Sequence, residues 1–226
     1  MSELNPPGNP SAPELNPLQQ DVLVELFNMS LGQAVSTLSD LVGEEVFVSL
    51  PEFRVVERAR MTEVIAEGLG AGVDMVAMPC RLLFAGQGAV AGLALLAAPR
   101  ESFRHLADLL WNHQSPPAGE RERMEQEAML EVGDLLLYTC ASNMSQFLES
   151  EIEGRAAVHV ENAASMLRDL APAWSPPGEP SLAELRVRFH LPDRDEVQGL
   201  MLFVLELSAL PLLRRELNRL LGKLGV

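Results

Sequence analysis

The stretch Asp21-Val-Leu-Val-Glu25-Leu-Phe-Asn28-Met-Ser-Leu-Gly32 has the spacing of an amphipathic helix. At 100° per residue, Asp21, Glu25, Asn28 and Gly32 fall within about 60° of one another around the helix axis. The apolar positions fall on the opposite side: Leu23, Phe27, Leu31, Ala34 and Leu38. We therefore expect a helix with a buried back that projects two carboxylates and one carboxamide together, with a glycine one turn further along the same row.

The helical period around this stretch extends from Leu18 to about Leu41, and Gly43 is a typical residue for its end. Residues 1–17 contain five prolines and no apolar periodicity, so we predict a disordered N-terminal tail. Taken alone, the polar row is what any solvated helix face carries. Other features of the chain must decide whether it is a functional site.

Downstream of this helix, β-like and helical patterns alternate. The run from Glu45 to Leu50 predicts a strand that Pro51 stops. The segment from Arg54 to Ala66 is ambiguous, and we expect a single strand or an edge segment there. The remaining expected elements are strands at 73–84 and 89–97 joined as a hairpin, a short helix at 101–111, a linker at 112–119, a long helix at 121–151, a short strand at 156–161, a turn or short helix at 162–170, a loop at 171–181, strands at 182–191 and 197–207, and a closing helix at 211–224.

The two halves of the chain carry these elements in the same order. Gly92-Leu-Ala-Leu-Leu in the first half matches Gly199-Leu-Met-Leu-Phe in the second, and the two long helices align at an offset of 106 residues. This pattern indicates an internal duplication. We predict an α+β fold in which two pseudo-two-fold units, at about 18–112 and 121–226, form one domain with one continuous sheet and both long helices on one face. Because the symmetry is internal, we expect a monomer.

The duplication also provides an internal control for the polar row. Its equivalents in the second half are Glu127, Glu131, Asp134 and Tyr138, and the position equivalent to Pro51 is Ala157. The second half thus keeps a polar row, but the side chains in it are different. Tyr138 in place of the small Gly32 is expected to fill the space beside Glu131 and Asp134.

Composition excludes several classes of function. The net charge of −15 argues against a nucleic-acid partner, because an acidic surface releases no counterions on DNA or RNA. We find no signal peptide and no apolar run of about 18 residues, so we expect a cytoplasmic protein that does not enter a membrane. Cys80 and Cys140 lie in apolar runs and are expected to be buried, reduced thiols. The histidines are scattered without metal-ligand spacing, so we expect no bound metal.

The row and its distant proline resemble a known signature. Asp21-x-x-x-Glu25-x-x-Asn28, followed after 22 residues by Pro51, is similar to the motif of the CheC/CheX/FliY family of response-regulator phosphatases, and most similar to CheC. The resemblance covers roughly residues 18–226, including the duplicated architecture. It implies a protein that docks on a phosphorylated chemotaxis receiver of the CheY type and accelerates hydrolysis of its aspartyl phosphate.

The resemblance assigns a role to each residue of the motif. Asn28 would orient the attacking water and Glu25 would pair with a lysine of the receiver, while Asp21 would lie at the edge of the contact and Pro51 would shape the adjoining strand end. Gly32 beside Asn28 would leave room for the partner to approach. The chain would need no cofactor, because Mg²⁺ belongs to the receiver's own site. A CheD-type deamidase is a further partner that the resemblance implies.

The second half departs from the family pattern at Asp134. An ionised aspartate cannot donate a hydrogen bond, and its charge opposes an incoming phosphoryl group. We therefore expect one working site in the first half and a degenerate second site at Glu127, Glu131 and Asp134, whose row is otherwise a solvated helix face. The alternative function is a non-catalytic binding module of chemotaxis or flagellar signalling, such as a CheD-binding or switch-like adaptor.

Overall fold

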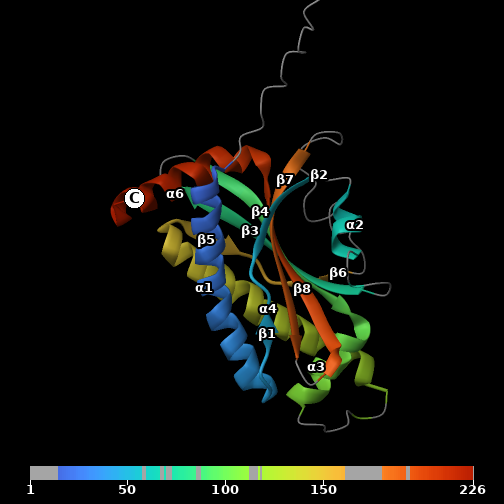
Figure 1. Cartoon of the computed structure of the whole chain (residues 1–226). Helices are drawn as coiled ribbons and strands as arrows, with labels where there is room; N and C mark the ends of the chain where they lie inside the picture. Colours follow the sequence, from blue (N-terminus) through green and yellow to red (C-terminus); the bar gives the residue numbers. More distant parts are fainter. Residues whose placement is uncertain are drawn as a thin grey trace, which may run out of the picture.

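The computed structural model describes residues 15–57, 60–66, 69, 73–84, 88–111, 117, 119–160, 180–191 and 194–225. The described elements follow the chain from a long N-terminal helix to a C-terminal helix (Figure 1). They are α1 (Pro17–Val42), β1 (Phe47–Val48), β2 (Glu52–Glu57), α2 (Met61–Ala66), β3 (Val73–Phe84), β4 (Gly88–Pro99), α3 (Arg100–Leu110), α4 (Arg121–Leu148), β5 (Glu151–Gly154), β6 (Val158–Val160), β7 (Pro180–Leu191), β8 (Arg194–Glu206), the 3₁₀ turn η2 (Leu207–Ala209) and α6 (Leu210–Leu224).

The described strands form one antiparallel sheet in the order β1-β7-β8-β4-β3-β5, with β2 also paired to β7 and β6 also paired to β3. The two hairpins, β3–β4 and β7–β8, meet at the centre, where Leu95 of β4 pairs with Leu202 of β8. The outer strands are exchanged between the halves: β1 and β2 extend the second-half hairpin, and β5 and β6 extend the first-half hairpin. The predicted continuous sheet is thus confirmed, and each half completes the sheet of the other.

Both long helices lie on the same face of this sheet, as the sequence predicted. Figure 1 shows α1 and α4 on one side and α2 on the other. The main core lies beneath α1, α3, α4 and α6, which pack their apolar residues on alternate sheet residues such as Val76, Ala94 and Leu96. The other residues of the same strands, including Ala77 and Leu95, join a second core with α2.

Burial on both faces explains why the central strands read as continuous apolar runs. Along β4, Leu93, Leu95 and Ala97 face the α2 side, while Ala94 and Leu96 face the long helices. Each of these side chains is at most 1% exposed. A strand that is buried on both sides shows no alternation of polar and apolar residues.

Helix α1 begins earlier than the sequence pattern suggested. Asn16 forms a capping box with Gln19, Pro17 occupies the first turn, and Leu15 is 3% exposed. The prediction of a disordered tail to residue 17 is therefore wrong for residues 15–17, and residues 1–14 lie outside the described ranges. At the other end, Gly43 adopts the left-handed conformation with φ 71°, as expected for a helix C-cap.

Three other predicted elements need correction. The segment from Arg54 to Ala66 contains the end of strand β2 and then helix α2, rather than one strand. The strand predicted at 45–50 is reduced to Phe47–Val48. The helix predicted to reach Glu151 ends at Leu148, and a strand that the sequence did not suggest begins at Glu151. The predicted hairpin turn at 85–87, most of the linker at 112–119, and residues 162–179 lie outside the described ranges.

The two cysteines have the environments that their apolar neighbours indicate. Cys80 and Cys140 are free and buried, and burial raises the pKa of each thiol to about 12. They therefore stay protonated at neutral pH. Among the described residues, no helix is both long and apolar enough to cross a membrane.

Candidate functional site

The back of α1 is fixed by the core, and this orients its polar row. Phe27 is fully buried and meets Phe203 of β8 edge to face, with ring centroids 4.6 Å apart. At the start of the helix, the side-chain amide of Gln19 donates to Asn218 of α6 at 2.7 Å. With its back held in this way, α1 cannot rotate, and the opposite row must face outward.

The row itself lies at the surface. Asp21, Glu25 and Gly32 are exposed and Asn28 is half-buried. A Cβ added at Gly32 would meet no heavy atom within 4 Å. Within the described ranges, no hydrogen bond or ion pair engages the side chains of Asp21, Glu25 or Asn28. Two acceptor carboxylates and one carboxamide, which can both donate and accept, are therefore available to a partner on one helix face.

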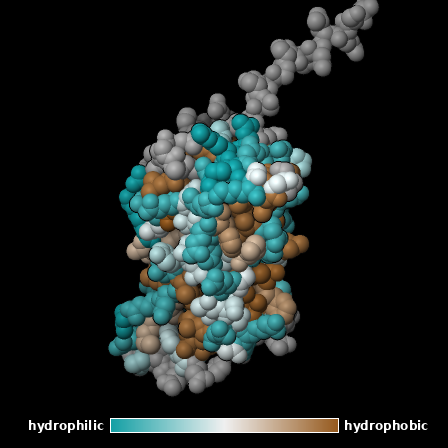
Figure 2. Space-filling view, turned by 90° about the vertical axis from the view of Figure 1, so that its left-hand side faces the viewer, coloured by the Kyte–Doolittle hydropathy of each residue, from teal (hydrophilic) through white to brown (hydrophobic). Residues whose placement is uncertain are grey.

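The row has both polar and apolar neighbours. On one side α4 packs against α1, and the amide of Asn143 donates to the backbone oxygen of Ser30 at 3.4 Å and to the side chain of Gln33 at 3.2 Å. Figure 2 shows apolar side chains among the polar ones on this side of the molecule. Met29, next to Asn28 in α1, is 51% exposed. Pro51 is buried, and Leu50 directly before it is 75% exposed. The row is thus a polar strip with the exposed apolar side chain of Met29 beside it.

The equivalent row on α4 has different contacts. Glu127 forms an ion pair with Arg123, and Asp134 accepts a hydrogen bond from the backbone N–H of Ala157 at 3.4 Å. Glu131 and Asp134 are exposed, and Tyr138 is 60% exposed. The expectation that Tyr138 occludes these carboxylates is therefore wrong. The second row differs from the first by its contacts and chemistry, and Asp134 is more exposed than its equivalent Asn28.

Comparison with known proteins shows which solved structures have a similar fold. No family model matches the sequence, and no curated protein matches it. Solved structures do: Thermotoga maritima FliY has a TM-score of 0.56 at 16% identity, covering 91% of this chain and 98% of the other. The FliM middle domain of H. pylori has a TM-score of 0.57 at 9% identity, covering 89% and 99%. CheX of Desulfovibrio desulfuricans has a TM-score of 0.51 at 10% identity, covering 81% and 100%.

This chain has the CheC/CheX/FliY fold. The likeness extends over most of this chain, and thus over both halves of the sheet and both long helices. A shared fold at such low identity does not by itself assign an activity, so function must be argued from the site.

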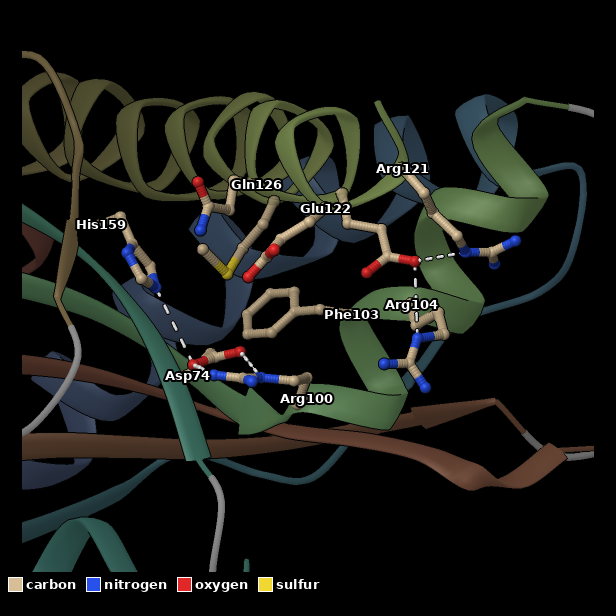
Figure 3. Close-up of a pocket in the computed structure, with 10 residues that line it drawn as sticks. Asp74, Arg100, Phe103, Arg104, Arg121, Glu122, Gln126 and His159 are labelled. Atoms are coloured by element: carbon tan, nitrogen blue, oxygen red, sulfur yellow. Dashed lines mark hydrogen bonds and ion pairs between the residues drawn. The ribbon is translucent and has the colours of Figure 1, made fainter. Parts of the chain in front are cut away.

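On this CheC/CheX/FliY fold, the structure also reveals a cavity that the sequence did not indicate. It encloses about 530 Å³ between β3, β6, α3 and the start of α4 (Figure 3). Glu122 and Gln126 point from α4 into it, and Phe103 of α3 forms part of its wall. Its lining residues come from four separate elements, so no contiguous motif could have signalled it.

The charges around this cavity largely neutralise one another. Arg100 donates to both carboxylate oxygens of Asp74, at 2.9 and 3.2 Å, and this contact raises the pKa of the Arg100 guanidinium. Glu125 lies between Arg121 at 2.7 Å and Arg104 at 3.4 Å. Each arginine of the lining already has an acidic partner, so the cavity presents no strong anion site.

In the described ranges, no three histidine, cysteine, aspartate or glutamate side chains are grouped to hold a metal ion. The polar row of α1 therefore remains the candidate site, because it combines exposed, unengaged side chains with a rigid helical support.

Proposed function

We propose that this chain accelerates hydrolysis of the aspartyl phosphate of a CheY-type chemotaxis receiver. In this proposal Asn28 orients the attacking water, Glu25 pairs with a lysine of the receiver, and Asp21 lies at the edge of the contact. Mg²⁺ is supplied by the receiver. The chain acts as a monomer, with one working site in its first half.

The observation that carries the proposal is the state of the α1 row. Glu25 is exposed, Asn28 is half-buried beside it, and neither side chain has a hydrogen-bond or ion-pair partner among the described residues. Gly32 adds open space on the same face. A phosphatase of this kind needs such a row unoccupied, because its partners are a water molecule and a group on another protein.

The reaction requires little from the chain beyond the correct positioning of the water molecule and of the receiver. An acyl phosphate is already reactive, and phosphoryl transfer depends mainly on alignment and charge neutralisation. A carboxamide can donate to and accept from one water molecule, so Asn28 can fix its orientation without titrating. Neither a nucleophile nor a metal of the chain's own is required.

Docking must rest on local complementarity. The net charge of −15 would repel an acidic receiver over most of the surface. Glu25 facing a receiver lysine would offset this repulsion at the contact, and the apolar Met29 beside the row would add buried area. A CheD-type deamidase is a second proposed partner.

A non-catalytic binding module is the second candidate function. It is favoured by the likeness to the FliM middle domain, whose TM-score of 0.57 is similar to that of FliY. In that case the row of α1 would bind a partner without changing the lifetime of its phosphoryl group.

The decay of a phosphorylated receiver separates the two candidates. We expect wild-type protein to accelerate decay and the double variant Glu25→Ala/Asn28→Ala to return it to the receiver's own rate, with its circular dichroism and melting temperature unchanged. A receiver that binds the wild-type chain but decays at its own rate would identify a binding module. A double variant as fast as wild type would eliminate the proposed site.

A further inference from the structure

The internal duplication allows the two rows to be compared at the level of individual backbone contacts. After α1, the backbone N–H of Val46 donates to the hydroxyl of Ser39 at 3.0 Å. After α4, the backbone N–H of Ile152 donates to the hydroxyl of Ser145 at 3.3 Å. Both residues of the first contact lie 106 positions before those of the second, so the chain leaves the two helices in the same way.

The equivalence continues into the sheet. The backbone N–H of Ser49 donates to the carbonyl of Arg188 at 2.8 Å, and that of Arg155 donates to the carbonyl of Pro79 at 2.9 Å. Ser49 and Arg155 are again 106 residues apart, while Pro79 and Arg188 are 109 apart.

The strands that follow keep this relationship. Strand β2 pairs Glu52 with Arg186, and β6 pairs Val158 with Ala77. These pairs have the same two offsets, 106 and 109 residues. Positions 51 and 157, which lie between the two sets of contacts, are therefore bracketed by equivalent backbone on both sides.

At this equivalent position the two halves differ in one hydrogen-bond donor. Ala157 has a backbone N–H, and it donates to Oδ1 of Asp134 at 3.4 Å. Pro51 has no N–H to donate. Asp134 lies 106 residues after Asn28, so the bond that engages Asp134 has no counterpart at Asn28.

We propose that Pro51 is a positioning residue whose missing N–H keeps the carboxamide of Asn28 free of a backbone hydrogen bond. A donor at position 51 would occupy an acceptor site of the carboxamide oxygen and turn the side chain toward the strand end. The consequence for rate rests on the proposed function, in which Asn28 orients the attacking water. On the same grounds, the backbone N–H of Ala157 restrains the side chain of Asp134. This restraint, together with the unfavourable charge of the carboxylate, disfavours a working second site.

The test compares Pro51→Ala with a chain that carries lactic acid at position 51, introduced as an α-hydroxy acid. Both lose the proline ring and carry a methyl group. Only Pro51→Ala gains an N–H, because the lactate form has an ester oxygen in its place. The pair therefore separates the effect of the donor from the effect of the ring.

The first readout is amide hydrogen exchange in the full chain. We expect the Ala157 amide of the wild-type protein to exchange faster after Asp134→Ala. In Pro51→Ala, the new amide should be protected, and this protection should be lost in Pro51→Ala/Asn28→Ala. A residue-51 amide that exchanges equally with and without Asn28 would overturn the inference.

The second readout is the pair kcat and KM on a phosphorylated receiver. For Pro51→Ala we expect kcat to fall about tenfold, or about 1.4 kcal/mol, with KM changed less than about twofold. The lactate form should keep the wild-type kcat. An unchanged kcat in Pro51→Ala, or an equal loss in the lactate form, would contradict this role.

The two readouts also distinguish this inference from the proposed function. If wild-type protein accelerates no receiver but the residue-51 amide depends on Asn28, the phosphatase proposal fails and the positioning of Asn28 stands. If the amide shows no such dependence, the positioning inference fails whatever the activity.

Discussion

Gly133 of α4 lies so close to Val76 of β3 that a Cβ at this glycine would be 2.6 Å from a methyl carbon of the valine and 2.8 Å from its Cβ. The helix therefore rests directly on the strand at this point. Because Val76 is fully buried and its branched side chain is short, it has little room to move.

We predict that Gly133→Ala destabilises the protein by about 1–3 kcal/mol through overpacking. The matched control is Gly32→Ala on α1, where an added Cβ meets open space. That substitution should be neutral or should stabilise by up to about 1 kcal/mol, since alanine is the better helix former. Urea denaturation of the two variants checks both values, and equal effects would contradict the close approach.

A second prediction concerns pH and the end of α4. Lys223 and Arg219 of α6 donate to the carboxylate of Glu149 and lower its pKa from its ordinary value near 4.5 to about 2. A lowered pKa in the folded state gives stability that is present above pH 4.5 and is lost as the pH falls toward 2. Melting temperatures between pH 5 and pH 2 should fall more steeply for wild-type protein than for Glu149→Gln. The control Glu151→Gln, which leaves the α6 contacts intact, should follow the wild type.

A third prediction concerns the buried ion pair of β7. Nε of Arg186 lies 3.3 Å from Glu184, and its guanidinium also donates to the backbone oxygen of Val64 in α2 at 2.6 Å. Arg186→Leu removes this cation and its hydrogen bond to Val64, so we expect a loss of about 3–5 kcal/mol. The double variant Glu184→Leu/Arg186→Leu should recover part of that loss, which denaturant titration can measure. A double variant less stable than the single one would contradict this expectation, because it would show that Glu184 stabilises the fold even without Arg186.

A fourth prediction concerns a substitution that gives the first half a residue of the second half. Gly32→Tyr places at the α1 row the residue that stands at the equivalent position of α4. The open space around Gly32 should let the protein fold normally, but the ring would stand where the proposed receiver docks. We expect KM for the phosphorylated receiver to rise, while Leu224→Tyr at the exposed end of α6 should leave it unchanged. Equal KM values would remove Gly32 from the docking surface.

The sequence was sufficient for the elements with strong local patterns. The 3.6-residue period of α1, the two hairpin strands around residue 86 and the repeated order of elements led to the fold class. These features depend on contacts between residues close in the chain, or on similarity between the halves. They can be read without knowing how the halves meet.

The end of α4 shows why other boundaries were missed. The C-cap residue is Glu149 in the left-handed conformation, with φ 49°, where a glycine is usual. Its partners, Arg219 and Lys223, come from α6 about 70 residues later. A helix end that depends on such distant contacts leaves no local signal. The predicted helix therefore ran on to Glu151, and strand β5, which begins there, was not predicted.

The exchange of strands between the halves and the cavity at the start of α4 were also not predicted. Both depend on contacts between residues that are far apart in the chain. The local sequences of β2 and β6 do not indicate that each strand pairs with a strand of the other half. At the candidate site, spacing alone placed Asp21, Glu25 and Asn28 on one helix face, and the resemblance to a known motif singled that face out. The hydrogen bond between Ala157 and Asp134 joins residues 23 positions apart, so it too left no local signal.

The most direct test of the central claim is the decay rate of a phosphorylated receiver at saturating concentrations of Asn28→Ala and of Asp134→Ala. These substitutions remove equivalent side chains of the two halves, and Asp134 lies outside the proposed site. We predict that Asp134→Ala accelerates decay as well as wild type, while Asn28→Ala loses the acceleration, by about 100-fold or to the receiver's own rate. Wild-type acceleration by Asn28→Ala, or its loss in Asp134→Ala, would contradict the account.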